Sequence, residues 1–130
     1  MPLRGDINIM EDTFRADGAI SQYRVVKYSS TQGFVTAAAA KDGNLTGVSQ
    51  HATSASGDTL RVRQAGKSLI TISGAVTKGI PLIVSDSTGR VSNLGGATGD
   101  GTIGVTEEGN PGSAGTSGDQ ITCFLQIRRI

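Results

Sequence analysis

The sequence has few of the side chains from which binding sites and enzymes are commonly built. Its 130 residues include no tryptophan, three phenylalanines, two tyrosines, one histidine and one cysteine. So few aromatic rings leave no stacking surface for nucleobases or sugars. The single Cys123 cannot pair within the chain, and its apolar, alternating surroundings predict a buried and inert thiol. We interpret His51, in a polar stretch with no second histidine, as a solvated loop residue.

The sequence also has no large excess of positive or negative charge. The 12 basic side chains nearly balance the 11 acidic ones, which leaves a formal net charge of +1. The chain therefore has no basic stripe of the kind that a phosphate backbone requires, and we expect no nucleic-acid partner. No apolar run is long enough to span a bilayer or to serve as a signal peptide, so we expect no membrane partner and synthesis in a cytoplasm.

Short motifs that occur in enzymes are present, but the sequence around them does not fit an active or cofactor site. Gly99, Gly101 and Gly104 spell G-x-G-x-x-G, but the following "VTEEGNPGS" cannot form the helix that a dinucleotide site needs. Asp58 and Asp119 each follow a glycine before an expected strand, which indicates turn formation, with a paired acid site as the alternative. No nucleophile, base and oxyanion donor come together, so we expect no enzyme, no metal and no cofactor.

What the sequence does have is β-forming segments, turns and an internal duplication. It contains 19 glycines and 3 prolines, with valine and isoleucine in short runs. Each copy is expected to contain two strands joined by a tight turn, then a short strand ending in Gly-Val, and a strand introduced by Gly-Asp. The matching segments are "GAISQYRVVKYSSTQGFV" (18–35) and "GAVTKGIPLIVSDSTGRV" (74–91), "DGNLTGVS" (42–49) and "DGTIGVT" (100–106), and "GDTLRV" (57–62) and "GDQITC" (118–123).

These copies predict an all-β fold. Neither has enough strands to bury its own apolar face, so we expect one core shared by both, in a small closed sandwich or barrel with a pseudo-twofold axis. The β domain is predicted to cover residues 18–130, with repeat one at about 18–64 and repeat two at about 74–125, joined by residues 63–73.

Three outward positions that are charged in the first copy are apolar in the second. Such a face is a candidate contact between copies of the chain, and the alternative is that it lies under a loop of the same chain. The apolar residues are Ile80, Ile83 and Phe124, in place of Arg24, Lys27 and Arg63.

Residues 1–17 lie before the first copy and are expected to form an extended N-terminal arm. Ile7 and Ile9 alternate there, flanked by Asp6 and Met10. Such an arm can add a strand to the sheet edge of another protein. The alternative is that it forms the first strand of its own sheet.

The order of the short motifs carries a family resemblance over about residues 14–127. The Gly-Val strand ends, the Gly-Asp strand entries and the hairpin "GIPLIVSDSTGRV" together resemble the small capsid cement, or head decoration, proteins of tailed bacteriophages. Ile80 and Pro81 depart from that pattern, which more often has Gly-Asp there.

The resemblance implies a structural virion protein made in the host cytoplasm. It would bind the outer surface of the mature capsid, clamp neighbouring major capsid subunits against the pressure of packaged DNA, and associate with itself as a homotrimer, with a dimer as the alternative. On this interpretation Asp6, Ile7, Ile9 and Met10 contact the capsid. A phage tail or fibre accessory domain and a cell-surface binding module are the alternatives.

Overall fold

The structure, a computed structural model, describes residues 10–40, 42–74, 76, 79–93, 101–106 and 118–129. These residues form strands, turns and bends and contain no helix, which confirms the prediction of an all-β, barrel-like fold. In chain order the strands are β1 (Met10–Ala16), β2 (Val25–Tyr28), β3 (Phe34–Ala37), β4 (Leu45–Ser49), β5 (Thr59–Thr71), β6 (Pro81–Val84), β7 (Val91–Asn93), β8 (Gly101–Thr106) and β9 (Gln120–Arg129).

The first five strands form a closed barrel. They are ordered β1-β3-β2-β4-β5, and an antiparallel pairing between β1 and β5 closes the ring. One pair, β1 with β3, is parallel. The barrel encloses an apolar cluster because successive side chains of each strand point alternately inward and outward. That cluster consists of Ala16, Ile20, Val26, Val35, Leu60 and Val62, with Phe14 packed against it.

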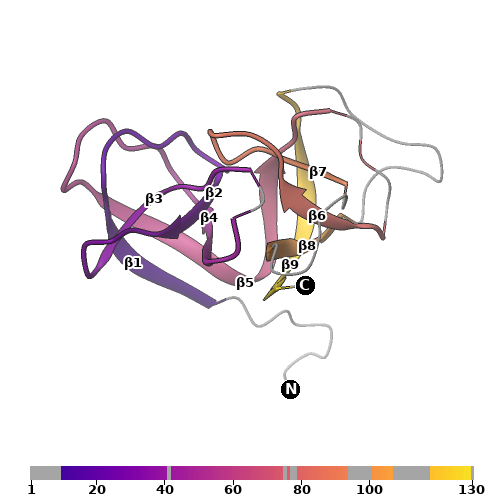
Figure 1. Cartoon of the computed structure of the whole chain (residues 1–130), viewed down its shortest axis with the longest axis horizontal. Coiled ribbons are helices and arrows are strands. Elements are labelled where there is room, and N and C mark those ends of the chain that lie inside the picture. The colour runs from indigo at the N-terminus through magenta and orange to yellow at the C-terminus, as the bar shows by residue number, and fades with distance from the viewer. Residues whose placement is uncertain are drawn as a thin grey trace, which may run out of the picture.

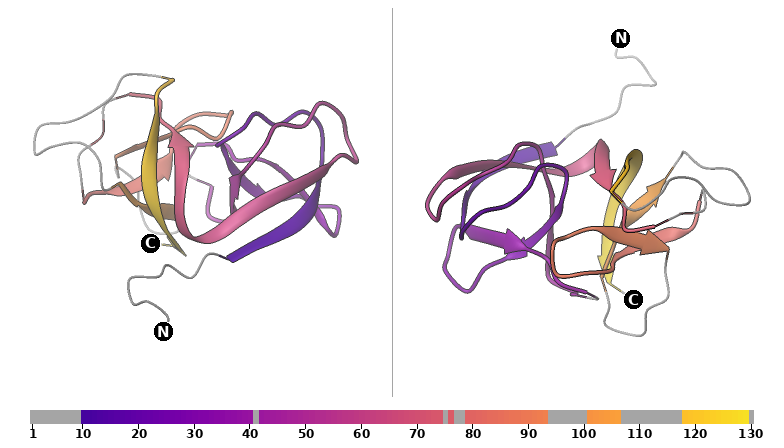
Figure 2. Two further views of the ribbon diagram at one scale, coloured as in Figure 1. Left: turned by 180° about the vertical axis from the view of Figure 1, so that it is seen from behind. Right: turned by 90° about the horizontal axis from the view of Figure 1, so that it is seen from above.

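β5 continues beyond this barrel and begins a second one. It is 13 residues long, and its C-terminal half pairs with β9, followed by β8, β6 and β7. A parallel bridge between Ile72 and Val91 connects β7 back to the end of β5. Figure 1 shows the two lobes side by side, with β5 running from one into the other, and Figure 2 shows the same arrangement from behind and from above. Below, the first unit is residues 10–65 and the second unit is residues 66–129.

The strand pairings of the two units correspond residue by residue. Residues at equivalent positions pair with each other in both units. This holds also for β1 of the first unit, whose equivalent in the second unit is the C-terminal half of β5. Corresponding pairs are Val26–Gly47 and Leu82–Gly104, Tyr28–Val35 and Val84–Val91, Val48–Arg63 and Val105–Phe124, and Phe14–Leu60 and Ile70–Ile121.

This correspondence moves the boundaries expected from the sequence. Residues 10–16 were assigned to an arm outside the duplication, but they form β1, which closes the first barrel. Their counterpart is the stretch 66–72, which was assigned to the linker and forms a strand of the second unit. The alternative that the arm supplies a strand of its own sheet therefore holds for residues 10–16. Residues 1–9, with Asp6, Ile7 and Ile9, lie outside the described residues.

The second apolar cluster also serves as the junction between the units. It contains the second-unit counterparts of the first cluster, such as Ile72, Leu82 and Ile121, together with side chains on the outer face of the first barrel. These outer residues are Val25, Ala38, Leu45 and Val48. Since burying one such side chain contributes about 1.5–3 kcal/mol, the junction is part of the folded core and not a loose contact between domains.

Candidate interaction surfaces

The polar residues considered for chemistry have structural partners. The Arg61 backbone N–H donates to His51 Nε2 at 3.2 Å, and His51 Nδ1 lies 3.2 Å from the Ala52 carbonyl oxygen. The Asp58 carboxylate accepts from the backbone N–H groups of Ser54 and Ala55 at 3.0 Å, and these bonds lower the pKa of Asp58. His51 therefore fixes a loop to a strand, and Asp58 forms the turn that the sequence indicated.

Neither a metal site nor a reactive thiol is visible in the part of the chain that the structure describes. No group of three or more histidine, cysteine, aspartate or glutamate side chains there could hold a metal ion. Burial raises the pKa of Cys123 to about 12, so its thiol stays protonated near neutral pH. Across the same residues, no helix is long and apolar enough to cross a membrane.

The three residues expected to form an apolar contact face do not share one environment. Ile80 is 40% exposed, in the turn that precedes β6. Phe124 is partly buried on β9, between Lys67 of β5 and Val105 of β8. Ile83 is only 4% exposed, so its assignment to an oligomer contact is wrong. The chain's own atoms cover Ile83, as in the alternative interpretation.

Met10 is the one predicted capsid-contact residue within the described structure. Its side chain is 56% exposed at the first position of β1. It follows directly on residues 1–9, so whatever those residues bind, Met10 lies where they join the barrel. Tyr28, which is 49% exposed, makes an edge-to-face contact with Phe14 at 6.2 Å between ring centres, an apolar feature that the sequence analysis did not single out.

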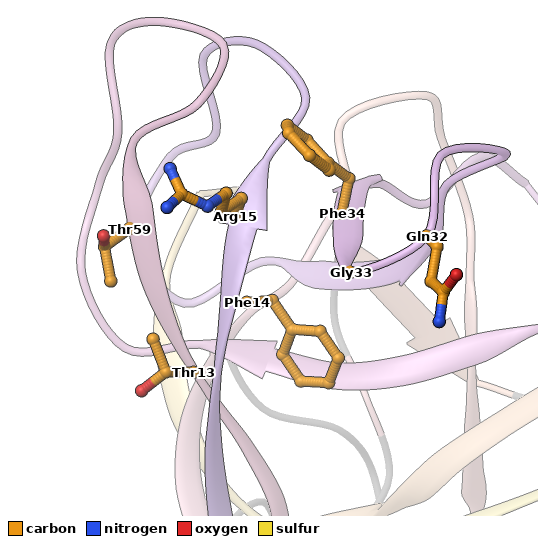
Figure 3. A pocket seen from close by; sticks show the side chains of 7 residues that line it. All are labelled: Thr13, Phe14, Arg15, Gln32, Gly33, Phe34 and Thr59. Atoms are coloured by element: carbon orange, nitrogen blue, oxygen red, sulfur yellow. The ribbon is translucent and has the colours of Figure 1, made fainter.

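A shallow pocket on the first unit was also missed from the sequence. It measures about 330 Å³ and lies where the turn before β3 approaches β1 and the start of β5 (Figure 3). The Arg15 backbone N–H donates to the Gly33 carbonyl at 3.0 Å, which holds the two walls together. The lining residues are Thr13, Phe14, Arg15, Gln32, Gly33, Phe34 and Thr59.

The corresponding place on the second unit is occupied by the chain itself. There the segment Tyr23, Arg24 and Val25 of the first unit docks through three hydrogen bonds. The Thr71 N–H donates to the Tyr23 carbonyl at 2.9 Å, the Val25 N–H donates to the Gly89 carbonyl at 2.9 Å, and Arg24 Nη1 donates to the Thr88 carbonyl at 3.1 Å. This docked segment is the polar part of the junction between the units.

The electrostatics of the junction reflect partial burial of a cation. Desolvation lowers the pKa of Arg24, the nearby charge of Arg90 lowers it further, and Asp86 opposes both effects. Arg24 Nε is buried and has no hydrogen-bond partner among the residues that the structure describes. Asp86 also accepts from Arg90 Nε at 2.6 Å.

The fold is that of a pair of small β-barrels that share a strand, and it has a known structural counterpart. The chain is similar to the N base of the head fiber protein gp8.5 of bacteriophage phi29, known from a crystal structure, with a TM-score of 0.67 and 17% sequence identity. The likeness covers 92% of this chain and 95% of that chain, so it includes both barrels. No protein-family model and no curated protein sequence matches the chain.

Proposed function

We propose that the protein is a structural component of a tailed-phage virion and binds the outer surface of the head. The observation that carries the proposal is the likeness of fold, over nearly the whole of both chains, to the base of a phage head fiber. The resemblance of its motif order to capsid cement proteins points to the same location.

The binding partner in this proposal is the major capsid protein, and the effect is to clamp neighbouring subunits. A protein that binds the expanded shell and not its precursor stabilises that shell by mass action. A symmetric oligomer, such as the trimer, places several weak contacts on one lattice. Once one contact forms, the others become intramolecular, and avidity exceeds single-site affinity by a factor of about 100 or more.

The capsid contact is assigned to Asp6, Ile7, Ile9 and Met10. The exposed Met10 supports the assignment, because an apolar side chain that is 56% exposed lies where these residues enter the barrel. The alternating Ile7 and Ile9 suit strand addition to a capsid sheet edge, in which backbone hydrogen bonds give affinity and alternate side chains give register.

The test is cosedimentation of the purified protein with expanded, undecorated phage heads and with unexpanded proheads. We expect saturable binding to the expanded heads alone. Deletion of residues 2–9 combined with Met10→Ser should abolish this binding and leave the barrels folded. Leu69→Ser, at a comparably apolar position that is 38% exposed on the second unit, is the control and should bind normally.

Failure of the wild-type protein to bind either particle would exclude the capsid proposal. Normal binding by the truncated protein would exclude the arm as the contact. A second function, the attachment base of a fibre, is suggested by the name of the structural neighbour. A clamp should raise the temperature at which heads release their DNA, whereas an attachment base should bind without changing that temperature.

A further inference from the structure

We infer that the pocket on the first unit is the docking site for residues Gly79, Ile80 and Pro81 of a second copy of this chain. The inference deepens the self-association that forms part of the proposed function, by naming the two surfaces that meet. It starts from the corresponding place on the second unit, where the structure shows what such a surface binds.

The pocket and the occupied junction are built from corresponding residues. Three pocket residues, Arg15, Gln32 and Gly33, are the counterparts of Thr71, Thr88 and Gly89, which bond to the docked segment in the second unit. A Cβ atom placed on Gly89 would collide with the backbone of Val25, whereas one placed on Gly33 would meet no atom of the described residues within 4 Å. The same surface is thus filled in one unit and open in the other.

The segment that would fill it begins with the same backbone conformation and hydrogen bond as the segment that fills the junction. Gly79 and Tyr23 correspond, and both have a left-handed backbone, with φ of 80° and 58°. Their N–H groups donate to corresponding carbonyls, of Thr106 at 3.1 Å and of Ser49 at 2.9 Å. A left-handed φ is uncommon for a tyrosine, and at Tyr23 it occurs in a residue whose carbonyl accepts from Thr71 across the junction. Gly79 has that conformation next to an exposed Ile80.

The side chains on the two open surfaces have changed in a matched way. At the junction Arg24 lies near Arg90 and Asp86, and its guanidinium bonds to the backbone of Thr88. The corresponding residues of the open surfaces are Ile80 on the segment, Phe34 and Gln32 in the lining of the pocket, and Ser30 close to them in the sequence. A charged contact within the chain is therefore matched by an apolar contact between chains.

Proline at position 81 decides which hydrogen bonds the contact uses. In the junction, the Val25 N–H donates to the Gly89 carbonyl, and the Thr71 N–H donates to the Tyr23 carbonyl. Pro81 corresponds to Val25 and has no N–H to donate. The Gly33 carbonyl therefore keeps its bond from Arg15, and the contact between copies is carried by Ile80 packing on Phe34 and the stem of Gln32.

Such a contact joins two different surfaces of the chain, so repeating it generates a ring or an open filament. The experiment is sedimentation equilibrium of the purified full-length protein without phage heads. We expect the wild type to self-associate, and Ile80→Arg and Phe34→Asp each to weaken association about 30-fold, the effect of losing a central contact residue. Ile80→Arg introduces the side chain that the first unit has at this position, so its fold should be preserved. Leu69→Asp, which changes a side chain of similar exposure elsewhere, should associate normally.

Mixing the two defective variants distinguishes this geometry from any self-complementary contact. Ile80→Arg retains an intact pocket and Phe34→Asp retains an intact segment, so an equimolar mixture should form a one-to-one heterodimer and nothing larger. A second measurement uses cysteines at Ile80 and Gln32, which a short bismaleimide should link between copies, since the native Cys123 is buried and unreactive.

Each possible failure is informative. A wild type that sediments as a monomer throughout the concentration range overturns the inference, as does unchanged association of both variants or equal loss with Leu69→Asp. Absence of crosslinks between copies also overturns it. Because no heads are present, these results are independent of cosedimentation: an associating protein that does not bind heads would refute the proposed capsid role and leave this contact intact.

Discussion

Gly47 and Gly104 allow the strands around them to approach more closely than any side chain would permit. They are the first residues of the Gly-Val motif in the two units and occupy corresponding positions on β4 and β8. A Cβ atom on Gly47 would overlap the carbonyl oxygen of Arg63 and lie 2.7 Å from Val62 Cγ1. On Gly104 it would overlap the carbonyl oxygen of Phe124. We predict that Gly47→Ala and Gly104→Ala each destabilise the fold substantially.

The magnitude follows from what must move. Heavy atoms attract at about 3.5–4.0 Å, so the Cβ would lie about 1 Å too close to a backbone carbonyl that is paired in the sheet. Relief requires displacement of β5 or β9, and overpacking of this kind costs about 1–3 kcal/mol. Alanine would regain about 0.5–1 kcal/mol from the lower backbone entropy of the unfolded chain. The net loss is therefore about 1–2 kcal/mol, which corresponds to a fall in Tm of about 4–8 °C for a chain of this size.

The measurement is thermal unfolding followed by far-ultraviolet circular dichroism, with urea denaturation for the free energy. Gly74→Ala is the matched control, because its Cβ would meet no atom within 4 Å in the described part of the chain and its backbone is not left-handed. The control should be neutral or slightly stabilising. If Gly47→Ala proved as stable as Gly74→Ala, the close approach of the strands would not be a constraint and the reasoning would fail.

Three further predictions concern charge, burial and the first strand. Burial alone would raise the pKa of Asp86, but hydrogen bonds from Thr88 and Arg90 lower it to about 2. Because Asp86 is partly exposed and screened by solvent, Asp86→Asn should cost only about 1 kcal/mol at neutral pH. The difference in Tm should vanish as the pH falls from about 4 to 2, and a difference that persists below that range would contradict this. Cys123 should react with a thiol reagent at least about 1,000-fold faster in denaturant than in the native state, and equal rates would contradict its burial. Deleting residues 2–13 should lower stability by about 3 kcal/mol relative to deleting 2–9, because residues 10–13 pair with β5; equal Tm values would show that β1 is dispensable.

The turns were predictable because their causes are local. Gly33 and Gly89, in the "STQG" and "STG" turns, have φ of 82° and 79°, and the glycines of the Gly-Asp strand entries, Gly57 and Gly118, have φ of 93° and 92°. Each requires a left-handed backbone that glycine adopts without strain. The duplicated order of strands followed from these repeated turns and from the Gly-Val motif.

The limits of the duplication and the surface residues were not predictable in the same way, because they depend on distant pairing. When "MEDTFRA" (10–16) is aligned with "GKSLITI" (66–72), both segments have an apolar residue at only two positions. At these positions Phe14 aligns with Ile70, and Ala16 aligns with Ile72. Their equivalence becomes visible through pairing with β5 and β9. Alternation along β6 placed Ile83 on an outer face, but alternation alone does not say what covers that face. The pocket likewise arises from segments that are far apart in sequence.

The shared strand β5 also sets a rule for how this protein can change in length. Its 13 residues have a contour length of about 40 Å at about 3.3 Å per residue. Inserting one residue near its middle would turn every inward side chain of its second half outward and shift the second barrel along the first. The length of β5 therefore fixes the spacing between the two units, and a fixed spacing would suit the proposed binding to a capsid lattice of regular repeat.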